Sequence, residues 1–136
     1  MAQSEVFVGV DVSKAWLDVA VWPGGQAWRV ANDRAGRGDL VRRLKRLTGL
    51  QAVGFEASGG YEQSLLKALL DGDLPARRIN PTRIRKFAQA CGVLAKTDAI
   101  DALMIARFAA TLPGRLAEHN KAAEALAELV TARRQL

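Results

Sequence analysis

Two short and almost unbroken apolar runs, each ending in an acidic residue, most constrain the fold of this chain. Residues 6–10 precede Asp11, and residues 52–55 precede Glu56. Runs of this length and composition are typical of strands that are covered on both faces of a sheet. Open α/β sheets carry their functional sites at the carboxyl ends of such strands. The sequence therefore predicts an α/β fold in which Asp11 and Glu56 lie at one edge of a central sheet.

The other segments predict a mixed five-stranded sheet flanked by helices. The Pro23-Gly24-Gly25 turn joins two early strands as a hairpin, so the chain begins with an antiparallel meander. Strands are predicted at residues 6–12, 15–22, 26–31, 51–56 and 75–79, and helices at 39–48, 61–70, 81–91, 98–110 and 117–136, with a loop at 32–38. The 136 residues suffice for about one domain. A mixed sheet with acids on its first and fourth strands and on a late helix is the ribonuclease H-like arrangement.

A third acidic segment, Lys96-Thr97-Asp98-Ala99-Ile100-Asp101-Ala102, opens an alanine-rich helix. Residues three apart share one face of a helix, so Asp98 and Asp101 are expected on the same side, next to an apolar interior. Two interpretations are open for this pair. Thr97 could be an N-cap followed by acids that suit the helix dipole, or the two carboxylates could be ligands.

The expected convergence of Asp11, Glu56, Asp98 and Asp101 on one site favours the interpretation of these acids as metal ligands. Two carboxylates about 4 Å apart repel by roughly 4 kcal/mol at an effective dielectric constant of 20. Four together require protonation or a bound cation. The chain has one cysteine and one histidine, which excludes an internal disulfide and a zinc site of Cys and His ligands. Oxygen ligands alone favour Mg²⁺ or Mn²⁺.

The net charge of +6 and the pI of about 10.1 favour an anionic partner such as DNA or RNA. Residues 74–97 contain six basic residues and no acid. These predicted nucleic-acid contacts are Arg77, Arg78, Arg83, Arg85, Lys86 and Lys96. The segment leads into the acidic one, so we interpret it as a phosphate track rather than a merely solvated face. A second basic stretch comprises Arg42, Arg43, Lys45 and Arg46.

Several other residues have both a structural and a functional interpretation. Asp18 could lie near the acids, but a solvent-facing strand residue is favoured, and Glu62 is favoured as a first-turn acid. Lys14 or Lys96 could contact a phosphate. The three tryptophans could stack on bases, although cross-strand packing is favoured. No apolar run approaches the length of a membrane span and the N-terminus does not resemble a signal peptide, so a cytoplasmic protein is expected.

Four motifs together resemble the DEDD transposases of the insertion-sequence family numbered one hundred and ten, whose relatives include the Piv DNA invertase. They are Gly9-Val10-Asp11-Val12-Ser13-Lys14, Glu56-Ala57-Ser58-Gly59-Gly60-Tyr61, Asn80-Pro81 with Phe87-Ala88, and the segment from Lys96 to Ala102. The resemblance implies a RuvC-like catalytic domain over residues 1–114. It also implies that Asp11, Glu56, Asp98 and Asp101 are a metal-binding tetrad used in DNA strand cleavage and exchange.

In that family a coiled coil and a second domain with a serine nucleophile follow the RuvC-like domain, and a bridge RNA guides recombination. Residues 115–136 resemble the start of the coiled coil, so we expect a truncated chain that is incomplete as a catalyst. An apolar stripe in this segment predicts a homo-oligomer; it comprises Leu126, Leu129, Val130 and Leu136.

Three alternative functions are open. The chain could be a non-catalytic module that binds guide RNA or DNA, or a RuvC-like nuclease that acts alone. The Gly9-Val10-Asp11 sequence also resembles the first phosphate loop of actin-like nucleotide-binding domains, although such folds need two halves and a second glycine-rich loop.

Overall fold

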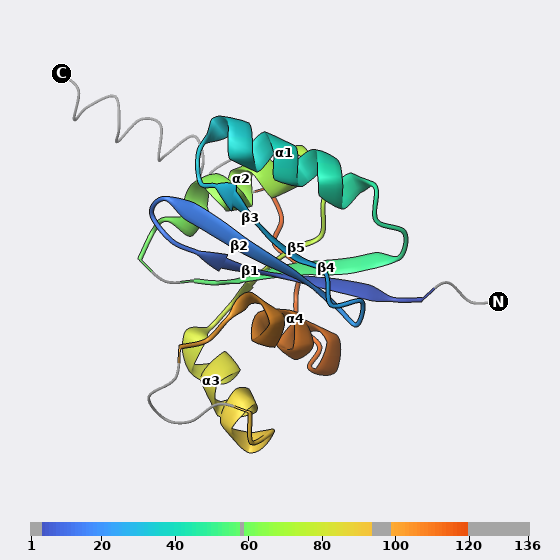
Figure 1. The fold of residues 1–136 in the computed structure, drawn as a ribbon, viewed down its shortest axis with the longest axis vertical. Coiled ribbons are helices and arrows are strands. Elements are labelled where there is room, and N and C mark those ends of the chain that lie inside the picture. The colour runs from blue at the N-terminus through green and yellow to red at the C-terminus, as the bar shows by residue number, and fades with distance from the viewer. Residues whose placement is uncertain (1–3, 58, 94–98, 120–136) are drawn as a thin grey trace.

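The computed structural model describes residues 4–57, 59–93 and 99–119, and its centre is a mixed five-stranded sheet (Figure 1). The strands are β1 (Val6–Val12), β2 (Trp16–Trp22), β3 (Ala27–Ala31), β4 (Leu50–Glu56) and β5 (Ala76–Ile79). Their order across the sheet is β3-β2-β1-β4-β5. The first three strands form an antiparallel meander, and β4 and β5 are parallel to β1. The predicted mixed sheet is confirmed.

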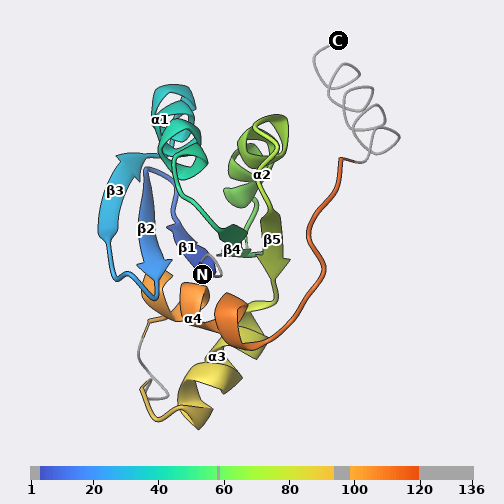
Figure 2. The same ribbon diagram turned by 90° about the vertical axis from the view of Figure 1, so that its right-hand side faces the viewer.

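Helices cover both faces of this sheet, as Figure 2 shows. The helices α1 (Arg34–Lys45) and α2 (Glu62–Asp71) lie on one face. On the other face α4 (Ala102–Thr111) crosses β1, β2 and β4, and α3 (Pro81–Ala90) packs against α4. The candidate site is formed where α3 and the residues before α4 approach the carboxyl ends of β1 and β4.

Two apolar cores follow from the alternation of side chains along the strands. The larger core joins one face of the strands to α1 and α2; its members include Val8, Val10, Leu17, Val19, Phe55, Leu40, Leu44, Leu65 and Leu69. The smaller core lies beside α3 and α4 and includes Ile79, Ile84, Ile105 and Phe108. In the smaller core the rings of Phe87 and Phe108 meet edge to face, with centroids 5.6 Å apart.

Glycine in the central strands lets α4 lie directly on the sheet. A Cβ atom on Gly9 would collide with the carbonyl oxygen of Ala102 and lie 2.5 Å from the backbone nitrogen of Ala106. A Cβ atom on Gly54, in β4, would lie 2.9 Å from the Ile79 side chain. The close approach holds the N-terminus of α4 next to the end of β1, where Asp11 lies.

Two predicted helix starts were wrong, and the first helix also ends at Lys45 rather than at Thr48. The first helix begins at Arg34 rather than at Asp39, because the Asp33 side chain caps it by accepting a hydrogen bond from the Gly36 backbone at 2.7 Å. The fourth helix begins at Ala102 rather than at Asp98. By contrast, α3 begins at Pro81 with Asn80 as its N-cap, as predicted.

The strand boundaries and those of α2 agree with the sequence to within one residue. Residues 117–119 are not helical, although a helix was predicted from residue 117, and the remainder of that segment lies outside the described residues. Within the described parts of the chain, no helix is both long and apolar enough to cross a membrane.

Candidate active site

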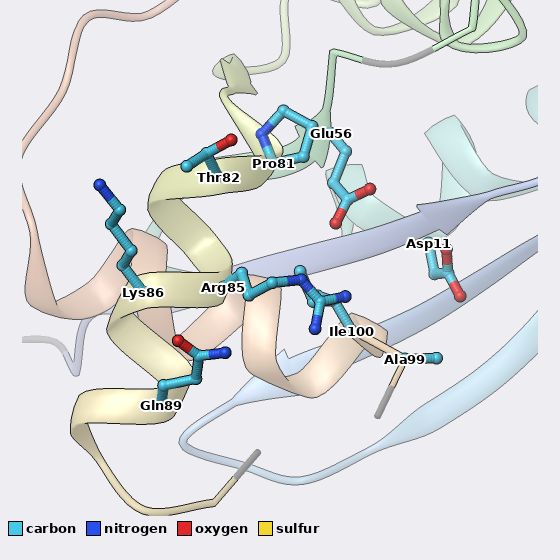
Figure 3. A pocket seen from close by; sticks show the side chains of 9 residues that line it. All are labelled: Asp11, Glu56, Pro81, Thr82, Arg85, Lys86, Gln89, Ala99 and Ile100. Carbon is cyan, nitrogen blue, oxygen red and sulfur yellow. The ribbon is translucent and has the colours of Figure 1, made fainter. Parts of the chain in front are cut away.

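Asp11 and Glu56 lie side by side because β1 and β4 are parallel neighbours. Val10 and Phe55 are partners in the ladder, so the acids that follow them share the carboxyl edge of the sheet. Both are partly buried, and both line one pocket of about 540 Å³ (Figure 3). The sequence-based prediction that the apolar strands bring these two acids together is confirmed.

Helix α3 supplies a polar and basic wall to the pocket. The lining comprises Pro81, Thr82, Arg85, Lys86 and Gln89 of α3, and Ala99 and Ile100 before α4. Arg85 extends from α3 toward the space in front of the two acids (Figure 3). The pocket therefore places cationic side chains opposite a pair of carboxylates, which suits a ligand that carries anionic oxygens next to a cation.

The pKa values of Asp11 and Glu56 are both raised. Burial is the main cause for Asp11, followed by the negative charges of Asp18 and Asp101. Burial is also the main cause for Glu56, followed by the charge of Asp11, while Arg85 acts in the opposite direction. Because the ionised form of each carboxyl group is unfavourable here, either a proton or a bound cation stabilises it.

Asp101 comes near these acids by a different route from the one predicted. It precedes α4 in an extended conformation and caps the helix, because its Oδ1 accepts a hydrogen bond from the Met104 backbone at 2.9 Å. Asp101 therefore lies outside the helix that was predicted to begin at Asp98. Asp98 and Lys96 are not among the described residues. The negative charge of Asp101 contributes to the raised pKa of Asp11.

The donor chemistry at this edge fits a hard divalent cation. Among the described residues, no group of three or more acidic, histidine or cysteine side chains lies close enough to hold a metal ion. Mg²⁺, however, is commonly bound by one or two carboxylates, with water and substrate phosphates completing its octahedron. The Asp11 and Glu56 pair meets that requirement.

Asp18 is a neighbour of Asp11, and its side chain is 40% exposed, which agrees with the favoured interpretation as a solvent-facing strand residue. It lies directly opposite Asp11 in the antiparallel ladder of β1 and β2. Arg29 binds its two carboxylate oxygens, with donor–acceptor distances of 2.8 and 3.3 Å. The Arg29 guanidinium also lies 5.1 Å from the ring centroid of Trp16. Strand alternation, which puts Asp18 and Trp16 on one face, was the available signal.

Glu62 has a structural role. It is buried in the first turn of α2, and its carboxylate accepts a hydrogen bond from the Gly60 backbone at 3.0 Å. Arg78 lies 3.9 Å from that carboxylate. The interpretation of Glu62 as a first-turn acid agrees with these contacts.

The basic residues of the predicted phosphate track are divided by the structure. Arg85 and Lys86 line the pocket, and Arg83 is exposed with its guanidinium 5.6 Å from the centroid of the Phe108 ring. Arg78 is exposed beside Glu62. Arg77 is only 4% exposed, and it donates hydrogen bonds to the carbonyls of Leu112 at 2.7 Å and Ala109 at 3.4 Å. A side chain so enclosed cannot reach a phosphate, so Arg77 is left out of the proposed contacts.

Replacing Arg77 by Ala is expected to destabilise the fold without weakening nucleic-acid binding. Burial, and to a lesser extent Arg83, lowers the pKa of Arg77, and its guanidinium satisfies carbonyls at the end of α4. Losing these bonds should cost about 2–4 kcal/mol of unfolding free energy, measured by urea denaturation. Arg83→Ala is the matched control and should cost much less. Equal destabilisation by both changes would contradict this role.

The raised carboxylate pKa values predict a pH dependence of stability without metal. A group with a raised folded-state pKa holds its proton more tightly in the folded chain, so it stabilises the fold while protonated. In EDTA, the free energy of unfolding should therefore fall as pH rises from the ordinary values of 3.8 and 4.5 through the raised values. Urea titrations of wild type and Asp11→Asn should show a smaller fall in the variant. Parallel profiles would contradict the assignment.

The sheet order, the acids at the ends of β1 and β4 and the capping acid before α4 define a ribonuclease H-like domain of the RuvC type. The chain belongs to the DEDD transposase family of IS110 type, whose family model, described as a transposase, matches residues 8–136. This finding confirms the family resemblance drawn from the sequence motifs. No curated protein matches the sequence.

Solved structures resemble this chain at low sequence identity. RuvC from T. thermophilus, in complex with a Holliday junction substrate, is 15% identical and has a TM-score of 0.58; the match covers 84% of this chain and 100% of RuvC. The inorganic polyphosphate/ATP-glucomannokinase from Arthrobacter sp. strain KM is 13% identical over 71% of this chain and 52% of its own, with a TM-score of 0.47. The structural similarity to RuvC shows a shared fold.

Proposed function

We propose that this chain is the catalytic domain of a DNA transposase, which cleaves and exchanges DNA strands with a divalent cation. The observation that carries the proposal is the pair of carboxylates with raised pKa values in a pocket walled by cationic side chains. Membership of the transposase family supports the reaction class. The RuvC relative, whose structure holds a Holliday junction, supports DNA as the partner.

In this proposal Asp11, Glu56, Asp98 and Asp101 hold Mg²⁺ or Mn²⁺. When bound, the cation supplies charge stabilisation to the attacking and leaving oxygens of the phosphodiester. Arg85 and Lys86, across the pocket from the acids, bind the non-bridging phosphate oxygens and hold the phosphate beside the acids. The Asp101 cap holds the start of α4, and hence its own carboxylate, near Asp11.

Further features of the proposal come from the family resemblance. The RuvC-like domain spans residues 1–114. A bridge RNA guides the choice of DNA, and a serine from a further domain acts as the nucleophile. The metal site then activates that serine. Residues 115–136 contribute to a coiled coil and to a homo-oligomer, and the protein acts in the cytoplasm.

The nucleic-acid contacts can be tested by the salt dependence of binding. Four basic residues remain for contact: Arg78, Arg83, Arg85 and Lys86. Four neutralised phosphates should make the affinity for a labelled DNA duplex fall about a hundredfold between 50 and 200 mM salt. Changing Arg83, Arg85 and Lys86 together to Ala should lower the affinity and make this fall clearly smaller than in wild type, measured by fluorescence anisotropy. The control Lys67→Ala, on α2, should leave the slope unchanged. A triple variant with the wild-type slope would refute these contacts.

A further inference from the structure

The outer side of α1 carries a concentration of positive charge that the proposed active site does not use. Residues 34–46 contain six basic residues and one acid. Among the basic residues, Arg34, Arg42, Arg43, Lys45 and Arg46 are exposed. The inner side of α1 is held to the sheet by Leu40 and Leu44, which are fully buried. The basic side chains are therefore displayed on a fixed helix rather than on a loop.

Three of these arginines line a surface pocket of about 550 Å³, which we call the α1 arginine pocket. Its lining consists of Arg42, Arg43 and Arg46, with Asp39 and Leu47. The Arg43 guanidinium lies 3.7 Å from the ring centroid of Trp28 on β3, so the indole orients it. Arg42 forms an ion pair with Asp39. One carboxylate among three guanidiniums leaves an excess of positive charge in the hollow.

The helix dipole explains only part of this arrangement. Cations in the last turn of a helix are favourable, and Arg42 and Arg43 belong to that turn. However, Arg42 and Arg46 are four residues apart, where like charges repel. Arg43 is oriented by a tryptophan of the neighbouring strand. An anion bound between the guanidiniums would relieve the repulsion, and the planar fork of arginine suits phosphate oxygens.

The α1 arginine pocket and the candidate active site lie in opposite layers of the fold. Helix α1 packs on one face of the sheet, whereas α3 and α4 lie on the other (Figures 1 and 2). Asp11 follows the alternation of Gly9, which faces α4, and not that of Val8 and Val10, which face α1. A duplex with a persistence length of about 150 base pairs does not bend around one small domain. Nucleic acid at α1 is therefore a separate segment from the one at Asp11 and Glu56.

We propose that the α1 arginine pocket binds the phosphodiester backbone of a second nucleic-acid segment while the first occupies the active site. This inference rests on the proposed function, because it assumes that the first segment lies at the carboxyl edge of the sheet. Arg42 and Arg46 are one helical turn apart, about 6 Å along the axis, so they can contact successive phosphates of one strand. Guanidinium forks match the oxygens of a phosphodiester, so we assign the binding to the backbone, which DNA and RNA share.

The test uses the whole 136-residue chain and two labelled duplexes of unrelated sequence, one of DNA and one of RNA. Wild type should bring donor-labelled and acceptor-labelled duplexes together on one protein, giving energy transfer between them. The triple change of Arg42, Arg43 and Arg46 to Gln should abolish the transfer and retain one bound duplex. In wild type, the binding of the second duplex should depend on salt as expected for three neutralised phosphates. Its affinity should fall about fortyfold between 50 and 200 mM salt.

A double variant distinguishes the loss of binding from a loss of folding. Arg42→Gln with Arg46→Gln keeps the contact between Arg43 and Trp28, and should weaken the second step roughly tenfold at an unchanged melting temperature. Separate arms with two DNA or two RNA duplexes identify which backbone the pocket prefers. Unchanged energy transfer in both α1 variants would overturn the proposal. The change of Arg83, Arg85 and Lys86 to Gln should remove binding of the duplex at the active site. If that binding persists while the α1 variants lose the second duplex, the proposed active-site contacts are wrong and the α1 pocket is supported.

Discussion

Replacing Asp11 by Asn is expected to remove most of the thermal stabilisation that Mg²⁺ gives to the wild-type chain. The ion binds the folded carboxylates far better than the unfolded chain, so it raises the free energy of unfolding. At about 100 times the dissociation constant this gain is ~2.7 kcal/mol, or roughly 10 °C in melting temperature for a domain of this size. Differential scanning fluorimetry with and without Mg²⁺ or Mn²⁺ measures the difference.

The same substitution should leave the metal-free chain as stable as wild type or slightly more stable. Burial and the charges of Asp18 and Asp101 raise the pKa of Asp11, so its ionised form is unfavourable at neutral pH. Asp18→Asn is the matched control, because that carboxylate is held by Arg29 and should contribute little to metal binding. Equal metal-induced stabilisation of wild type and Asp11→Asn would refute the metal site.

Replacing Gly9 by Ala is expected to destabilise the fold and to weaken the metal response together. The added methyl group would meet the backbone of α4 at Ala102 and Ala106, neither of which can rotate away as a side chain could. Overpacking of this kind costs typically 1–3 kcal/mol, and we expect the upper end. Moving α4 would also move Asp101 away from Asp11. Urea denaturation and the Mg²⁺-induced melting shift measure the two effects.

Gly38→Ala provides the control for this change. Gly38 lies within α1, and an added Cβ atom would be 3.5 Å from the flexible end of Arg42, an ordinary contact. Alanine in a helix interior should stabilise the chain by about 0.5–1 kcal/mol. The two glycine substitutions should therefore have opposite signs. A Gly9→Ala variant as stable as wild type would contradict the packing of α4 on β1.

The positions of the strands and of two acids could be predicted from the sequence because they depend on local pattern. An apolar run of this length predicts a buried strand whatever the position of that strand in the fold. Parallel pairing then aligns the ends of β1 and β4 and brings Asp11 and Glu56 together. The start of α1 was missed because Gly36 and Gly38 are poor helix formers. The Asp33 cap and the packing of Gly36 against the Ala31 backbone compensate for them.

The roles of Asp101, Asp18 and Arg77 were decided by the tertiary structure. Asp101 is a capping residue because the chain is extended before α4, a conformation that residue spacing alone does not reveal. Asp18 lies beside Asp11 only because the register of β1 and β2 pairs them. Arg77 belongs to a basic segment, yet it is buried and donates hydrogen bonds to the carbonyls of Ala109 and Leu112 at the end of α4. Sequence determines where charges lie along the chain, whereas the packing of distant elements determines which are desolvated and which face a ligand.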